Sequence, residues 1–230
     1  MKPAIRLAWF TAASLVVLVW SGLALAHDVA QGDRAFVEAT QGPAFFPFLY
    51  LGAKHMVTGY DHILFLIGVV MFLRRTRDVV LYVSMFTIGH SLTLLLGVLF
   101  KTGANSHLVD AIIGLSIVYK GAENLGWLRR IGWSVDTRLA VLIFGLCHGL
   151  GLATKLISLS ISPDGLIFNL LSFNLGVELG QILVLLFVVS LLNAWRTGRN
   201  FEKRAALTNW FLVAAGSLII IHQAGEYFAT

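Results

Sequence analysis

Residues 166–195 read LIFNLLSFNLGVELGQILVLLFVVSLLNAW, and Glu178 is the one charged residue in this apolar stretch. A helix needs about 20 predominantly apolar residues to cross the hydrocarbon core of a bilayer, so the stretch is long enough to do so. A charged side chain at the bilayer centre costs about 2.5 to 3.5 kcal/mol, which is why so long a run with so little charge is typical of a membrane span. These residues therefore predict a transmembrane helix.

The rest of the chain has the same character. Hydrophobic residues make up 57% of its 230 residues and charged residues 13%, about half of the charged share of a typical soluble domain. The predicted spans are 48–73, 79–100, 108–128, 139–157, 166–195 and 207–228. Because the connections between them are short, the sequence predicts an all-α membrane protein whose residues 45–230 form a bundle of six transmembrane helices.

The N-terminus has the features of a signal peptide. Lys2 and Arg6 precede an apolar run at 7–23, and Ala24-Leu25-Ala26 is a small-x-small triplet. We expect cleavage after Ala26, so that 1–26 are the signal peptide and 27–44 a short periplasmic tail. Since an apolar run of this length is at the lower limit for spanning a bilayer, an uncleaved first helix is the alternative.

Basic residues gather in three alternate loops. They are Arg74, Arg75 and Arg77, then Arg129, Arg130 and Arg138, then Arg196, Arg199, Lys203 and Arg204. The positive-inside rule assigns these loops to the cytoplasm and therefore both termini to the outside, in the inner membrane of a bacterium. The net charge of +5 is thus explained by topology and not by nucleic-acid binding, and the single cysteine excludes a disulfide framework.

Metal-ligand side chains recur inside the predicted spans, mostly at similar depth. They are His55, Asp61, His62, His90, His148, Glu178 and His222. Imidazole and carboxylate groups bind nickel, zinc, cobalt and copper, and metal binding offsets the cost of burying them. We predict one shared metal site open to the periplasm, with His62, His90 and His148 as central ligands.

Further polar residues are predicted to support these ligands or to line the path to them. They are Asn174, Gln181, Glu123, Asn124, Lys120, Glu226 and Ser91. Asn174 and Gln181 share a helical stripe with Glu178, and Glu226 lies four residues after His222, close enough to orient its imidazole. His27, the first residue of the expected mature chain, is a candidate entry ligand.

Three features leave alternatives open. A histidine inside the membrane can simply bridge helices by hydrogen bonding, which contributes about 0.6 kcal/mol on average. Lys120 and Glu123 are three residues apart, so they can neutralise each other or form part of an exit path. Gly59, near the middle of the first predicted span, permits a break into two half-helices.

Two segments that contain histidine are similar to each other. FTIGHSLTL at 86–94 aligns with FGLCHGLGL at 144–152, and both are expected to cross the membrane in the same direction. Gly145, Gly149 and Gly151 in the second segment are small enough to let a neighbouring helix approach closely.

The motifs together resemble a known family, the HupE/UreJ hydrogenase and urease accessory proteins. The resemblance covers residues 45–228 and is carried by HMxxGxDHILF at 55–65, FTxxHSxT at 86–93, EN at 123–124, FGLxHGLG at 144–151 and FNxGVExGQ at 173–181. It implies a small membrane protein that acts as a nickel permease or as a metal-binding accessory factor, with histidines as metal ligands. Proteins that mature nickel enzymes are the implied partners.

Three functions follow from these residues. A permease would take a divalent metal, nickel before zinc, cobalt or copper, at the outer site and release it inside. An intramembrane metal-dependent hydrolase would use three protein ligands and one open position on a zinc-type metal. A metal chaperone would bind the ion without moving it across the membrane. A polar route beyond the site favours the permease, whereas a closed inner half favours the hydrolase.

Overall fold

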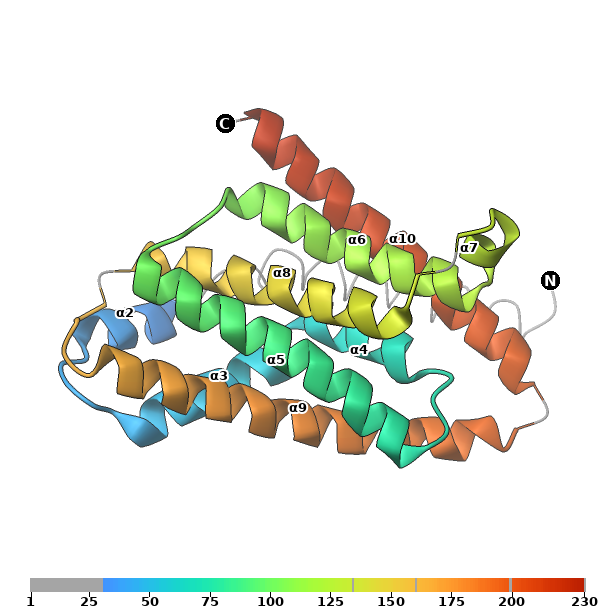
Figure 1. Ribbon diagram of the computed structural model, residues 1–230, viewed down its shortest axis with the longest axis horizontal. Helices are drawn as coiled ribbons and strands as arrows, with labels where there is room; N and C mark the ends of the chain where they lie inside the picture. Colours follow the sequence, from blue (N-terminus) through green and yellow to red (C-terminus); the bar gives the residue numbers. More distant parts are fainter. Residues whose placement is uncertain (1–30, 134, 160, 199, 230) are drawn as a thin grey trace.

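The computed structural model describes residues 31–133, 135–159, 161–198 and 200–229, and this part of the chain contains helices and no strand. The expected signal peptide and His27 lie outside the described residues. The helices are α2 Gln31–Ala39, α3 Phe45–Thr58, α4 Tyr60–Val70, α5 Thr76–Phe100, α6 Ser106–Asn124, α7 Trp127–Arg130, α8 Thr137–Ile157, α9 Leu166–Arg196 and α10 Phe201–Ala229. Successive long helices run back and forth along one axis, and the three basic connections lie at the same end of the bundle, beside α7 (Figure 1).

Four of the described helices, α5, α8, α9 and α10, are long and apolar enough to cross a membrane. The prediction of an all-α membrane protein is therefore confirmed, but the prediction of six such spans is wrong. The first predicted span is divided into α3 and α4, each too short to cross alone. The third predicted span is α6, whose 19 residues include Asp110, Lys120 and Glu123, and these three ionisable groups make it too polar.

The first span breaks at Gly59. This residue has extended backbone angles, φ −72° and ψ 93°, between the last residue of α3 and the first of α4. A β-carbon at this position would lie 2.8 Å from Nδ1 of His62 and 2.9 Å from the carbonyl oxygen of His55. Glycine is therefore required here for space, because the two helix ends fold closely around it.

Glycines hold three pairs of helices in close contact: α5 with α8, α3 with α9, and α6 with α10. A β-carbon on Gly145 or Gly149 of α8 would meet the backbone oxygen of Phe86 or His90 of α5. Gly176 of α9 approaches the backbone of Leu49 in the same way, and Gly216 of α10 that of Gly114. The close approach predicted for Gly145 and Gly149 is confirmed, and α5 and α8 run in the same direction, as the similarity of their sequences led us to expect (Figure 1).

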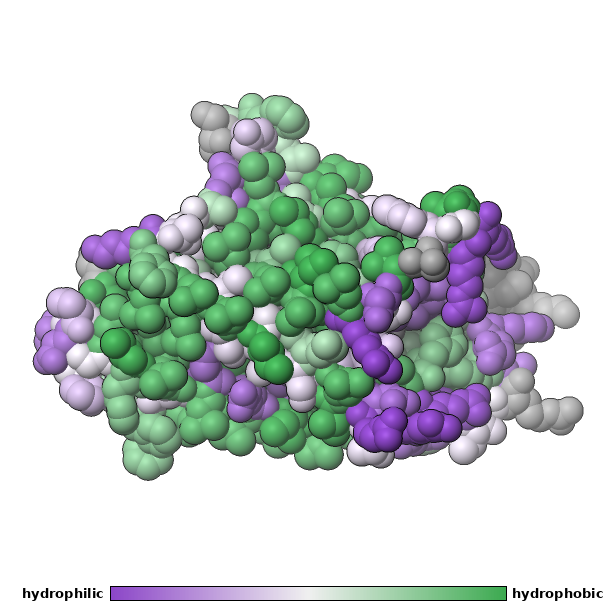
Figure 2. Space-filling model, in the orientation of Figure 1, coloured by the Kyte–Doolittle hydropathy of each residue, from purple (hydrophilic) through white to green (hydrophobic). Residues whose placement is uncertain are grey.

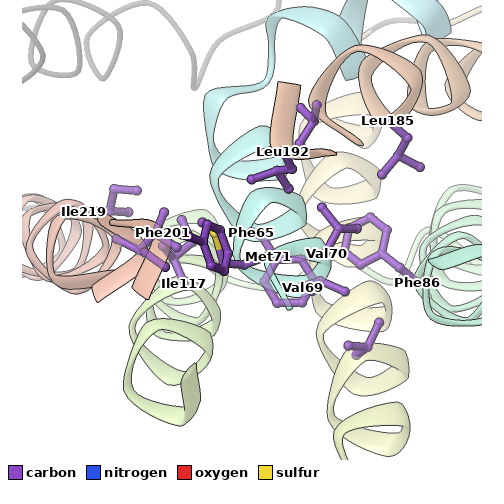
Figure 3. Packing of buried hydrophobic residues seen from close by; sticks show 14 residues of the cluster. Phe65, Val69, Val70, Met71, Phe86, Ile117, Leu185, Leu192, Phe201 and Ile219 are labelled. Carbon is purple, nitrogen blue, oxygen red and sulfur yellow. The ribbon is translucent and has the colours of Figure 1, made fainter. Parts of the chain in front are cut away.

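The helix α4 fills the centre of the bundle. Its buried residues Phe65, Val69 and Val70 are surrounded by apolar side chains from five neighbouring helices (Figure 3). Those neighbours are Phe86 of α5, Ile117 of α6, Val141 of α8, Leu185 and Leu192 of α9, and Phe201 and Ile219 of α10. The apolar middle of the outer surface and the hydrophilic residues gathered at the end that carries the basic loops fit a bilayer around the bundle (Figure 2).

We predict that Gly145→Ala destabilises the protein. The added methyl group would meet the backbone of Phe86, and overpacking of this kind costs about 1 to 3 kcal/mol. The matched control is Gly225→Ala in α10, where a β-carbon has no heavy atom within 4 Å. Thermal unfolding of the purified variants in detergent measures the effect, and equal midpoints for the two variants would contradict the packing role of Gly145.

Candidate metal centre

Four histidines from four helices meet at the break between α3 and α4. We call His55, His62, His90 and His148 the histidine cluster; they come from α3, α4, α5 and α8. His62 is central, since its ring centroid lies 5.1 Å from that of His55, 5.7 Å from that of His90 and 4.8 Å from that of His148. All except the partly buried His55 are no more than 3% exposed.

The cluster offers two sets of metal ligands that share one residue. His55, His62 and His90 form one set, and Asp61, His62 and His148 form the other; within each set the ligand atoms lie within 4.8 Å of one another. Oδ1 of Asp61 lies 3.0 Å from Nδ1 of His62 and also accepts a hydrogen bond from its backbone N–H. A carboxylate beside a ligand histidine fixes the ring orientation and raises its basicity.

The donor atoms of the cluster fit a metal ion. Among the residues that the structure describes, five buried imidazole nitrogens have no hydrogen-bond partner: Nε2 of His55, Nε2 of His62, Nδ1 and Nε2 of His90, and Nδ1 of His148. Buried polar atoms are nearly always paired, and each unpaired one costs about 1 to 3 kcal/mol. Hydrogen bonding between helices therefore does not explain these five nitrogens, whereas coordination of a cation would satisfy several of them at once.

An aromatic layer closes one side of the cluster. Phe65 and Phe86 have ring centroids 5.7 Å and 5.1 Å from that of His148, and Phe65 also contacts Phe144. Phe65 follows His62 along α4, while Phe86 and Phe144 precede His90 and His148, so all three lie toward the basic-loop end. The buried apolar core of α4 continues beyond them in the same direction.

Glu178 does not join the histidine cluster. It lies two residues from Gly176 and from Gly180, which both face α3, and at 100° per residue this places Glu178 on the opposite side of α9. Its exposed side chain lines a cavity of about 350 Å³ between α5 and α9, together with Ser84, Thr87 and Gln181. The Thr87 hydroxyl donates a hydrogen bond to Oε1 of Gln181, 2.8 Å away.

The other predicted residues lie at varying distances from the cluster. Ser91 adjoins His90 on α5, and its buried hydroxyl has no partner among the described residues. Asn174 is buried and donates to the backbone of Leu170 in its own helix. His222 and Glu226 are both exposed near the end of α10, and neither belongs to the two ligand sets.

Lys120, Glu123 and Asn124 form a separate polar network. Nζ of Lys120 donates to Glu123 at 2.6 Å, and the Thr137 hydroxyl of α8 donates to the other carboxylate oxygen. Asn124 donates to the backbone oxygen of Gly68 and to the side chain of Asn209, each at 2.8 Å. These contacts tie α6 to α4, α8 and α10, and they favour a structural role for the pair over an exit path.

Two buried polar residues of α6 were missed in the sequence, and one of them contacts the cluster. Ser116 of α6 lies 3.3 Å from Nε2 of His148. Asp110 of α6 is buried and accepts a hydrogen bond from Lys155 of α8 at 3.1 Å. Asp110 was detectable as an ionisable residue in an apolar segment, whereas nothing in the sequence indicated that Ser116 would contact His148.

The fold and the cluster define a helical membrane protein with a buried histidine and carboxylate centre. Comparison with protein families gives a match between residues 31–230 and the family described as HupE / UreJ protein. The chain therefore belongs to this family, which confirms the resemblance seen in its motifs and indicates an accessory membrane protein associated with a metal. No curated protein and no solved structure matched.

We predict that His62→Ala weakens metal binding more than any other single change in the cluster, because His62 belongs to both ligand sets. Loss of a group that only supports a ligand already costs about 10- to 100-fold in affinity, so we expect a loss of at least about 100-fold. Calorimetric titration of the purified protein with Ni²⁺ measures it.

His107→Ala is the matched control, because His107 bonds to Gln223 outside the cluster. It should keep the parent affinity, and so should His222→Ala. A loss at His222 equal to that at His62 would contradict the ligand sets described above.

Proposed function

We propose that this protein binds a divalent transition metal, nickel first, in the histidine cluster and acts as a metal permease or accessory protein of the membrane. The observation that carries the proposal is the group of five unpaired imidazole nitrogens where four helices meet. Nickel is chosen over zinc, cobalt and copper because of the family, since imidazole and carboxylate ligands accept all four metals. Proteins that mature nickel enzymes are the proposed recipients.

We also propose that the broken pair α3 and α4 and the polar helix α6 lie within the bilayer, packed against the four long apolar helices. The contacts of α6 with α4 and α8 support this arrangement, because they place Asp110, Lys120 and Glu123 against protein and away from lipid. The basic loops at one end support a cytoplasmic location for that end, with both termini in the periplasm. This is the topology of a bacterial inner-membrane protein, and it agrees with a cleaved signal peptide at 1–26.

Transport would require the aromatic layer to open. On the proposed topology, the cluster lies on the periplasmic side of Phe65, Phe86 and Phe144, and the packed core of α4 separates it from the cytoplasm. A hydrated cation cannot pass an apolar barrier of this kind. The permease proposal therefore implies a second conformation in which α4 shifts against α5 and α8.

The second candidate is an intramembrane metal-dependent hydrolase, which the closed layer favours because an enzyme needs access to its metal from one side only. Either ligand set has three protein ligands, the number that zinc enzymes use to leave one position for water or substrate. A metal chaperone that binds without translocation would use the same residues.

Metal content followed by uptake distinguishes these functions. Mass spectrometry of the purified protein should find about one transition-metal ion per chain, and sealed vesicles that contain the protein should accumulate that metal. Stoichiometric binding without accumulation would exclude the permease and leave the hydrolase and the chaperone, which a screen for hydrolysis of membrane peptides and esters then separates. Absence of any bound transition metal would overturn the proposal.

We predict that His90→Ala and His148→Ala each reduce metal affinity, because each removes one ligand from one set. The expected loss is about 10- to 100-fold, smaller than for His62→Ala. Circular dichroism of both variants checks that the helices remain folded. Unchanged affinity in both variants would exclude a shared site.

A further inference from the structure

A second site opens between α4 and α9 on the side of the bundle away from the polar cavity at Glu178. It is an apolar groove of about 1030 Å³, lined mainly by these two helices, with Val57 of α3 and Thr208 of α10 at its edges. Ile63 and Ile67 of α4 and Met71 directly after it line the groove; they recur every four residues and so form one face.

The break at Gly59 creates this groove. Before the break, α3 packs against α9 so closely that a β-carbon on Gly180 would lie 2.7 Å from the backbone oxygen of Ala53. Beyond the break, α4 turns into the centre of the bundle, while α9 continues for four more turns at the surface. An unfilled apolar space of this size would forfeit dispersion contacts along both walls, so a membrane component is expected to fill it.

The length of the groove matches one leaflet of a bilayer. Its wall on α9 extends from Leu183 to Trp195, about 18 Å of helix at 1.5 Å per residue. Half of a hydrocarbon core of about 30 Å is about 15 Å. The groove therefore fits the acyl chain of a single lipid better than a helix that crosses the whole membrane.

The end of the groove is basic. Arg196 follows Trp195 and is held there because its Nη2 donates to the backbone oxygens of Val70 and Met71, at 2.7 Å and 2.9 Å. Arg74 lies three residues after Met71, whose backbone oxygen accepts a hydrogen bond from Arg196, so the two positive charges lie at the same end of α4. Arg204 precedes Thr208 by one helical turn, and the Thr208 hydroxyl bonds to its backbone oxygen. Within the described part of the chain, none of the three arginines forms an ion pair.

We propose that this groove binds one anionic phospholipid, with an acyl chain between α4 and α9 and its phosphate at Arg74, Arg196 and Arg204. Trp195 marks the level of the headgroup, because tryptophan is enriched at membrane interfaces, and Thr208 lines the same end of the groove. Three arginines that form no ion pair within the described residues, on three different segments, provide the charge complementarity that selects an anionic headgroup. This site is separate from the histidine cluster and does not depend on the metal.

Native mass spectrometry of the full chain in detergent tests the proposal. Phosphatidylglycerol and phosphatidylcholine with identical acyl chains are titrated in parallel. One phosphatidylglycerol should bind at least about tenfold more tightly than phosphatidylcholine, since each basic residue near a lipid surface contributes about a factor of five. The double variant Arg74→Gln/Arg204→Gln should reduce that preference to about fivefold or less, since only Arg196 remains. Arg196 is left unchanged because its bonds hold the end of α4.

Two further variants make the result specific. Ala194→Trp places a large side chain at the mouth of the groove, where Ala194 is exposed, and should weaken both lipids. Arg129→Gln/Arg130→Gln removes two charges from α7 at the same end of the bundle and should retain the preference. Equal binding of the two lipids would overturn the proposal, and so would an unchanged preference in Arg74→Gln/Arg204→Gln. If the unmodified protein is a dimer and Ala194→Trp dissociates it, the groove binds a second copy of the chain and not a lipid.

Discussion

The interruption between α3 and α4 is the constraint on which the rest of the molecule depends. A continuous helix through 48–73 would place His55 and His62 two turns apart along one rod, nearly 11 Å in rise. The break at Gly59 instead folds the end of α3 against the start of α4, so that the two imidazole centroids lie 5.1 Å apart. It also frees α4 to enter the centre of the bundle, where its apolar side chains meet five other helices.

The close pairing of helices fixes the positions of His90 and His148, which the break at Gly59 does not determine. The helices α5 and α8 lie in parallel with glycines against backbone, so His90 and His148 are held at nearly the same depth. Gly149 packs directly on the backbone of His90. Neither helix can therefore shift without the other, and the two imidazoles keep their relative position. The cluster is therefore assembled by contacts between helix backbones. Its geometry does not depend on hydrogen bonds between the imidazoles, because five of their nitrogens have no hydrogen-bond partner in the described residues.

Hydrophobic runs were sufficient to predict α5, α8, α9 and α10, because length and apolar composition decide whether a segment can cross a bilayer. They did not decide the number of such helices. Gly59 breaks the first span and three ionisable residues make α6 too polar, yet the hydrophobic run continues through both segments. His62, His90 and His148 were predicted together from depth and ligand type, and the structure brings them within contact of one another. Glu178 and His222 have the same ligand chemistry but lie elsewhere. Glu178 faces another side of α9, and His222 lies about two turns beyond Gly216, which packs on α6 near the level of the cluster.

The rotation of each helix is set by its glycine contacts. On α10, Gly216 faces α6, and Gln223, two turns later, shares that face and bonds to His107. His222 is turned about 100° away from Gln223 and is exposed. A single sequence gives the spacing of these residues but not the partner against which Gly216 packs. The orientation of α10 therefore required the structure.

The position of His62 limits how the centre can be filled. Asp61 engages its Nδ1, which leaves Nε2 as the one ring nitrogen available to a metal, and a nitrogen lone pair serves one ion at a time. Two ions cannot then occupy both ligand sets with full coordination. The two ligand sets would therefore act as one mononuclear site with two overlapping positions, in which His62 would hold the ion while either His55 and His90 or Asp61 and His148 completed its ligands.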